Sequence, residues 1–180
     1  IRQRQHEMLM SVDEAVRSIF RSLGDRVDNT MFVLMSDNGL QLGVHRLVGK
    51  DVPYQASSNV PMAMRWDGEI ATGVDGRLML NLDLTATILE AASASLNTDG
   101  MSYFGPNRAG TVVEQMRSGK TSITKHTGYC GYRTRNWLFV EWGRDKGREL
   151  YHYPTDPYEL HSLQGKNKYR QVRQRLRQLA

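Results

Sequence analysis

Two oxygen-bearing side chains, Asp37 and Asn38, stand side by side directly after an apolar run of the chain. A carboxylate and a carboxamide offer the hard oxygen atoms that Ca²⁺ and Mg²⁺ prefer. Two ligands are too few for a complete site, so further ligands would have to come from elsewhere. Because Asp-Asn-Gly is also a strong turn former, a plain turn is the alternative interpretation of these residues.

A histidine and a lysine follow this pair along the chain, at His45 and Lys50. A lysine near a divalent metal is suited to neutralising an oxyanion such as sulfate or phosphate. A neighbouring histidine could donate a hydrogen bond or a proton to a leaving oxygen. Each of the two, taken singly, is more often a solvated surface residue. Only their combination with Asp37 and Asn38 indicates a reactive site.

Two elements before this segment would position it. The apolar run over residues 31–35 predicts a strand buried on both faces, as in a parallel sheet. Ligands of open α/β sheets bind beyond the carboxyl ends of such strands, which is where Asp37 and Asn38 stand. Apolar residues at three- and four-residue steps predict a helix over residues 3–23, which Gly24 would end.

The remainder of the chain predicts shorter elements. We expect an ordered loop up to about residue 58, a short strand over residues 60–65, and a helix over residues 84–92 with Asp83 as its N-cap. Residues 97–125 are weakly patterned and are expected to be mostly loop. Two hairpin strands, a third strand and a final helix are expected over residues 129–134, 137–142, 149–153 and 168–179.

The positive charge of the chain lies near its C-terminus. The sequence has 24 Lys and Arg against 19 Asp and Glu, a net charge of +5. Residues 1–143 hold 15 basic and 15 acidic residues, whereas residues 144–180 hold 9 and 4, so the whole excess falls in the tail. A nucleic-acid surface over the whole protein is therefore not indicated. The tail itself could bind a polyanion, or could form an ordinary solvated helix face. Its cations are Lys166, Lys168, Arg170, Arg173, Arg175 and Arg177.

A single cysteine, Cys130, excludes an intrachain disulfide and a cysteine-based zinc cluster. We expect it to be a small residue packed in a strand. No apolar run approaches the roughly 20 residues that span a bilayer, so no membrane partner is expected. The compartment of the protein stays open.

The order of these residues resembles the formylglycine-dependent sulfatases of the alkaline phosphatase superfamily. Residues 36–54 are similar to the family stretch S-D-N-G-x-x-L-G-x-H-x-x-x-x-K-x-x-x-Y. Residues 82–89 look like its D-L-x-P-T-x-L helix, with Ala86 where proline is usual. Residues 149–163 are similar to its closing E-L-Y-D-L-x-x-D-P-x-E-x-x-N-L pattern, with His152 where aspartate is common.

The resemblance implies a truncated alkaline-phosphatase-like α/β fold with a small C-terminal antiparallel sheet and a closing helix. Residues 1–125 would be the C-terminal part of the sulfatase core, and residues 126–180 a sheet-and-helix subdomain. Asp37 and Asn38 would be ligands of Ca²⁺ or Mg²⁺. Lys50 would contact the sulfate of the substrate, and His45 would lie near the substrate. Cys130 and the C-terminal motif would be structural.

The nucleophile of that family is absent from this sequence. Sulfatases use a cysteine or serine in a C/S-x-P-x-R motif, which is oxidised to formylglycine. Two residues before the five prolines stand Asp51, Asn59, Phe104, His152 and Thr155. We therefore expect the C-terminal portion of a sulfatase, inactive alone, with further metal ligands outside the chain. Its partner would be the missing N-terminal part of the enzyme or a second copy of the chain.

The resemblance implies that the whole enzyme hydrolyses sulfate esters. Two alternatives stay open at this point. The first is a phosphonate or phosphodiester hydrolase, since members of the same superfamily use a related metal pocket. The second is a non-catalytic module that binds sulfate or another polyanion.

Overall fold

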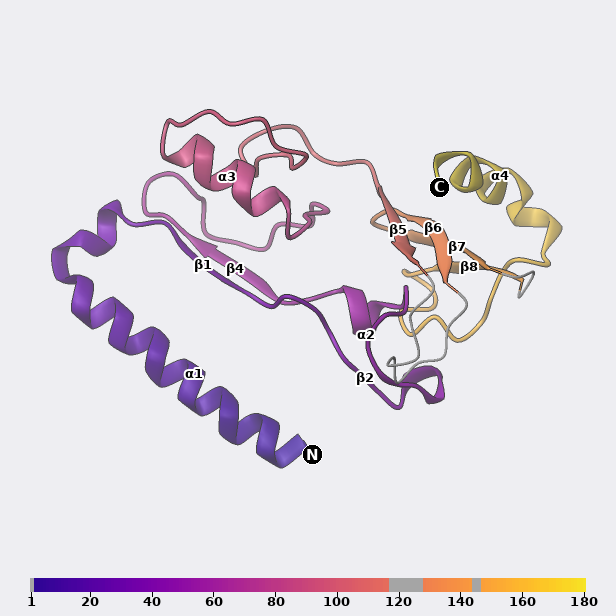
Figure 1. The fold of residues 1–180 in the computed structure, drawn as a ribbon, viewed down its shortest axis with the longest axis horizontal. Helices are drawn as coiled ribbons and strands as arrows, with labels where there is room; N and C mark the ends of the chain where they lie inside the picture. The colour runs from indigo at the N-terminus through magenta and orange to yellow at the C-terminus, as the bar shows by residue number, and fades with distance from the viewer. Residues whose placement is uncertain (1, 117–127, 144–146) are drawn as a thin grey trace. The chain divides into compact units, whose positions relative to one another are not determined.

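The computed structural model describes residues 2–116, 128–143 and 147–180 (Figure 1). Contacts group the chain into two compact units. The first joins the residues up to Met35 to Pro61–Gly73, and the second joins Ser36–Val60 to Val74–Ala180. These units describe packing, and the division of the chain at residue 125 stays a prediction.

The first unit combines a long helix with two short strands. Helix α1 (Arg2–Leu23) and strands β1 (Phe32–Met35) and β4 (Met62–Arg65) confirm the elements predicted there. Gly24 follows α1 with a positive φ of 53°, which glycine adopts without steric cost, and so ends the helix as expected. Phe20 of α1 stacks on Phe32 of β1, with ring centroids 4.1 Å apart.

The surroundings predicted for β1 were wrong. β1 pairs antiparallel with β4, and Leu34 in its centre is 52% exposed. A continuous apolar run indicates that both faces of a strand are to be buried, but it does not say whether the neighbouring strand runs parallel or antiparallel to it. Within the described ranges β4 is the one strand paired with β1. Side chains selected for burial on two faces are therefore only partly covered.

A four-stranded antiparallel sheet with the order β5-β6-β7-β8 forms the base of the second unit. Strands β6, β7 and β8 confirm the predicted hairpin and third strand. β5 lies in the range predicted to be mostly loop, because its short run is too weak a signal; residues 117–125 of that range lie outside the described residues. The strands span Thr111–Gln115, Tyr129–Arg133, Trp137–Trp142 and Arg148–His152.

One face of this sheet is covered by helix α4 (Arg170–Leu179). Phe139 of β7, Leu150 of β8 and Leu176 of α4 form a buried cluster there. The predicted helix at the C-terminus is thus confirmed, and Leu176 is its buried apolar residue. No helix in the described part of the chain is long and apolar enough to cross a membrane.

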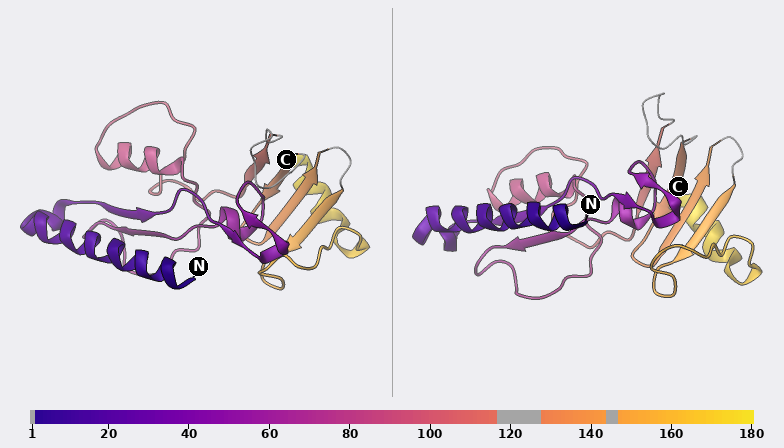
Figure 2. Two further views of the ribbon diagram at one scale, coloured as in Figure 1. Left: turned by 60° about the horizontal axis from the view of Figure 1, so that its bottom comes forward. Right: turned by 90° about the horizontal axis from the view of Figure 1, so that it is seen from below.

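The opposite face of the sheet packs against the segment that carries the candidate site. Successive residues of a strand face opposite sides, so Leu138 and Val140 of β7 point away from α4. They pack with Val52 and Tyr54, and all four side chains are buried. Figure 2 shows the sheet between α4 and the segment that contains helix α2 (Gln55–Ser58).

Between β1 and α2 the chain forms a small hairpin where only an ordered loop was predicted. β2 (Gln41–Leu42) pairs antiparallel with β3 (Val48–Gly49), and the 3-10 turn η2 (Val44–Arg46) joins them. The hairpin folds the chain back on itself. Residues on either side of it, 38 and 50, therefore come together.

Helix α3 (Asp83–Ala91) confirms the helix predicted over residues 84–92, but Asp83 is its first residue and not its N-cap. The Asp83 carboxylate accepts hydrogen bonds from the backbone N–H groups of Leu80 and Met101, each at 2.8 Å, and pairs with Arg108. The prediction failed because these partners lie outside the helix and satisfy a carboxylate that is only 2% exposed.

Candidate active site

The candidate site begins with a tight turn directly after β1. The Ser36 hydroxyl donates to the carbonyl of Asn38 at 3.0 Å, and the Asp37 carboxylate accepts from the Asn38 N–H at 2.8 Å. The Asn38 side-chain nitrogen donates to the carbonyl of Gly39 at 3.0 Å. That bond orients the carboxamide, so its oxygen is available to a different partner.

Lys50 is that partner. Its Nζ lies 2.6 Å from Asn38 Oδ1, and it stands directly after β3, where the hairpin returns the chain to the turn. The structure therefore brings together Asp37, Asn38 and Lys50, three residues that the sequence predicted to act at one place. An ammonium group held at this position can bind an oxyanion that lies beside the turn.

The turn is fixed from a second side by Asn81. Its side-chain nitrogen donates to the carbonyl of Asp37 at 2.8 Å. Asn81 stands just before α3, whose buried Asp83 anchors that end of the helix. Sequence reasoning gave Asn81 no role, because a side chain that binds a distant backbone carbonyl leaves no pattern in spacing or composition.

Asp37 and Asn38 suit a divalent cation by the type of their oxygens. The Asp37 side chain is exposed, and a carboxamide oxygen has two lone pairs, so Asn38 Oδ1 can accept from Lys50 and still face a cation. Their number is too small for a full site. The described residues hold no group of three or more His, Cys, Asp or Glu that could bind a metal ion. The two residues fit part of a Ca²⁺ or Mg²⁺ site.

His45 lies in an aromatic stack. Its ring stacks on that of Tyr54 with centroids 3.8 Å apart and planes 6° from parallel, and it meets Tyr151 edge-on. Its backbone is left-handed, with a φ of 54°. Its Nε2 is buried, and no hydrogen-bond partner for it is found among the described residues. The role expected for His45 near a substrate stays a prediction.

Tyr54 links this stack to the C-terminal sheet. Its hydroxyl donates to the carboxylate of Glu149, with a shortest distance of 3.0 Å, and the Tyr151 hydroxyl donates to the same carboxylate at 3.0 Å. Burial raises the pKa of Tyr54 above its ordinary value, and the negative charges of Glu149 and Glu159 raise it further. Tyr54 therefore stays a neutral hydrogen-bond donor at physiological pH.

Helix α2 lies directly on the turn. The Gly39 N–H donates to the carbonyl of Ser57 at 2.8 Å. A Cβ atom at Gly39 would collide with the backbone carbonyl oxygen of Ala56. This close approach explains why a glycine must follow Asn38, and it makes the place of the turn depend on the place of α2.

Comparison with known proteins decides the family. The model of the family described as Sulfatase matches residues 1–94, just over half of the chain and all of the segment from Asp37 to Tyr54. The chain belongs to the sulfatase family. The relatives and solved structures below are similar to this sulfatase chain over nearly its whole length.

The sulfatase chain is 24% identical over 188 residues to an N-acetylglucosamine-6-O-sulfatase of Bacteroides thetaiotaomicron, covering 95% of this chain and 33% of that protein. A protein solved in complex with its substrate D-glucosamine-2-N,6-O-disulfate matches with a TM-score of 0.82 at 23% identity, over 95% of this chain and 37% of the other. The chain thus spans about a third of the length of these relatives.

A phosphonate monoester hydrolase of Agrobacterium radiobacter has a similar fold as well, with a TM-score of 0.79 at 20% identity over 96% of this chain and 38% of the other. Together these likenesses confirm the predicted sulfatase-type α/β fold. At such identities they show the fold alone, and they do not choose between sulfate and phosphonate esters.

The close contact between Gly39 and α2 yields a direct prediction. We expect Gly39→Ala to lower the free energy of unfolding by about 2 kcal/mol or more, because a backbone carbonyl cannot move aside as a side chain can. Chemical denaturation followed by circular dichroism measures this change. Gly165→Ala is the matched control, since an added Cβ there meets nothing within 4 Å. Equal stabilities of the two variants would contradict the packing described.

Proposed function

We propose that the whole protein to which this chain belongs hydrolyses sulfate esters. The observation that carries the proposal is the contact between Lys50 Nζ and Asn38 Oδ1, which sets an ammonium group beside a hard oxygen atom of the residue that follows Asp37. Membership of the sulfatase family supports the same reaction. The descriptions of a curated relative and of a solved structure both name sulfated glucosamine chemistry, so sulfated amino sugars are the first substrates to try.

In this proposal each residue has a limited task. Lys50 binds the sulfate group and offsets its negative charge as the ester bond breaks. Asp37 and Asn38 hold Ca²⁺ or Mg²⁺, which supplies Lewis-acid polarisation of the sulfate oxygens when bound. His45, held against Tyr54, lies near the leaving-group oxygen. The nucleophile and the remaining metal ligands come from polypeptide outside these 180 residues.

Exposed apolar side chains support a covering partner in the first unit. On α1, Met8, Leu9 and Met10 are 62–70% exposed, and Leu34 of β1 is half exposed. Folded proteins bury most side chains of these types. We propose that the preceding part of the same enzyme covers them, and association of two copies of this chain is the alternative.

Activity measurements on the intact protein test the proposal. We expect turnover of 4-nitrophenyl sulfate or a 6-O-sulfated glucosamine, and we expect Lys50→Ala to lower kcat/KM by about 10²–10³-fold because the sulfate loses its charged partner. Arg21→Ala, at an exposed position on α1, is the control and should leave kcat/KM unchanged.

A different substrate preference would overturn the proposal. Faster turnover of a phosphonate monoester or a phosphodiester than of any sulfate ester would favour the phosphonate hydrolase alternative. Absence of turnover with all of them would favour the binding module. Release of sulfate by the 180-residue chain alone would contradict the proposed external nucleophile.

Metal binding is tested without reference to activity. We expect Asp37→Ala in the intact protein to weaken Ca²⁺ or Mg²⁺ binding at least about tenfold, since one charged ligand is lost. Isothermal titration calorimetry with each ion measures the affinity. Asp99→Ala is the control, because it removes the same charge at an exposed position that is not part of the turn. Unchanged affinity in Asp37→Ala would exclude the proposed ligand.

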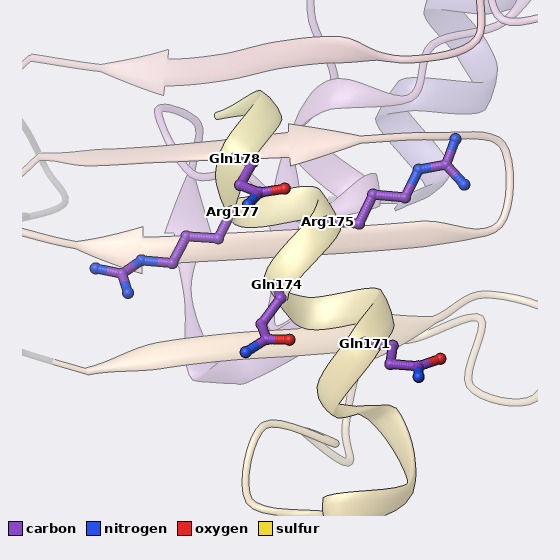
Figure 3. Close-up of a pocket in the computed structure, with 5 residues that line it drawn as sticks. All are labelled: Gln171, Gln174, Arg175, Arg177 and Gln178. Carbon is purple, nitrogen blue, oxygen red and sulfur yellow. The ribbon is translucent and has the colours of Figure 1, made fainter.

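A second function, binding of a polyanion, is favoured by helix α4. Arg177 pairs with Glu141 and Arg173 donates to the carbonyl of Gln164, whereas Arg170 and Arg175 are exposed and form no ion pair with described residues. Figure 3 shows Arg175 and Arg177 pointing to opposite sides of α4, around a pocket that Gln171, Gln174 and Gln178 also line.

Chromatography on heparin resin tests this second function. We expect the variant Arg170→Gln/Arg175→Gln to elute at a NaCl concentration lower by about 0.1 M, because fewer cations contact the polyanion. Arg4→Gln/Arg21→Gln on α1 changes the net charge equally and serves as the control. If both variants shift equally, binding depends on net charge alone and the α4 surface is not a site.

A further inference from the structure

A buried carboxylate of the C-terminal motif, Glu159, lies against the segment that carries the site. Glu159 is 1% exposed, and its backbone is left-handed with a φ of 58°. Asp156 stabilises this backbone, because its carboxylate accepts hydrogen bonds from the N–H groups of Leu160 and His161 at 3.0 and 2.8 Å. The resulting tight loop turns Glu159 toward α2.

Glu159 holds the first residue of α2. Its Oε2 accepts from the Gln55 backbone N–H at 2.9 Å, and the Gln55 side-chain nitrogen donates to the carbonyl of Pro157 at 3.2 Å. Arg133 of β6 reaches the same helix: its guanidinium donates to the Ser58 hydroxyl at 2.6 Å and to the Gln55 side-chain oxygen at 3.3 Å. The sheet and the loop after it therefore hydrogen-bond to both the first and the last residue of α2.

The other end of this chain of contacts is the turn of the candidate site. α2 contacts Gly39 through the hydrogen bond from Gly39 N–H to Ser57 oxygen, with no room for a side chain between them. Gly39 follows Asn38, whose oxygen accepts from Lys50. A displacement of α2 would thus move the backbone that carries Asn38, and with it the oxygen that accepts the hydrogen bond from Lys50.

We propose that Glu159 is a positioning residue for the candidate active site, acting through α2 on the turn that carries Asn38. The inference rests on the proposed function where it concerns catalysis, but its structural part stands without it. It assigns to the closing sheet and loop a task beyond stabilising the fold. The acceptor oxygen of Glu159, and not its charge, carries this task.

The protonation of Glu159 supports that distinction. Burial raises the pKa of its carboxyl group to about 7, although the Gln55 N–H, Arg133 and Tyr153 act in the opposite direction. Asp156, Tyr54 and Tyr151 face the same region. Well below pH 7 the group is mostly a neutral acid with an oxygen that still accepts a hydrogen bond, and glutamine has nearly the same shape and the same acceptor.

Kinetics of the intact protein test the catalytic part. We expect Glu159→Ala to lower kcat/KM for a sulfate ester at least tenfold, Glu159→Gln to stay within threefold of the parent, and the exposed control Glu90→Ala to be unchanged. In a Lys50→Ala background, Glu159→Ala should cost several-fold less than in the parent, because only its effect on the proposed metal ligands of the turn then remains. Equal losses in the alanine and glutamine variants, or a full loss in the Lys50→Ala background, would overturn the proposal.

Hydrogen exchange tests the structural part, whatever the enzyme hydrolyses. In Glu159→Ala the Gly39 and Gln55 amides should exchange at least tenfold faster than in the parent, and in Glu159→Gln they should not. If no sulfate ester is hydrolysed but this exchange pattern appears, the proposed function fails and the positioning role holds. Unchanged exchange of Gly39 in Glu159→Ala would reject the positioning role.

A pH series tests the burial of the Glu159 carboxyl group and does not require Glu159→Ala to fold. The pKa of Glu159 in the folded state is above the ordinary value of 4.5, so between pH 4.5 and 7 the folded protein keeps a proton that the unfolded chain has lost. As the pH rises through this range, the free energy of unfolding of the parent should therefore fall, and that of Glu159→Gln should fall less. Parallel melting-temperature curves of the two proteins would contradict a buried acid at this position.

Discussion

The contact between Gly39 and helix α2 is the constraint on which the rest of the candidate site depends. A backbone N–H of the turn meets a backbone carbonyl of the helix at 2.8 Å, and a side chain at Gly39 would not fit. Backbone atoms on both sides leave no flexible group to absorb a change. The position of Asn38, which accepts the hydrogen bond from Lys50, consequently depends on the contacts that hold α2 in place.

The C-terminal sheet and the loop after it hold α2. Val52 and Tyr54 are buried against β7, and Glu159 accepts from the first amide of α2. The other face of the sheet is closed by α4 through Leu176. The sheet is thus covered on both faces. This packed sheet supports the residues of the candidate site, which are themselves exposed or half-buried.

Much of this arrangement could be predicted from sequence, because helices and strands with clear apolar periodicity are local properties. The meeting of Asn38 with Lys50 was expected from their residue types and from the resemblance, and not from secondary structure, since the two-residue strands of the hairpin are too short to show a pattern. The antiparallel partner of β1 and the contacts of Asp83 were predicted wrongly, because they depend on residues distant in sequence. Asn81 gave no signal, and Glu159 was visible only as part of a motif with an assumed structural role.

A double-mutant cycle on stability tests most directly whether Glu159 and the turn are two ends of one packed unit. The free energy of unfolding would be measured for the parent, Gly39→Ala, Glu159→Ala and the combined variant. We expect the combined loss to be smaller than the sum of the single losses by about 1 kcal/mol or more, because releasing α2 from one anchor weakens the effect of the other. Additive losses, within about 0.5 kcal/mol, would contradict the account.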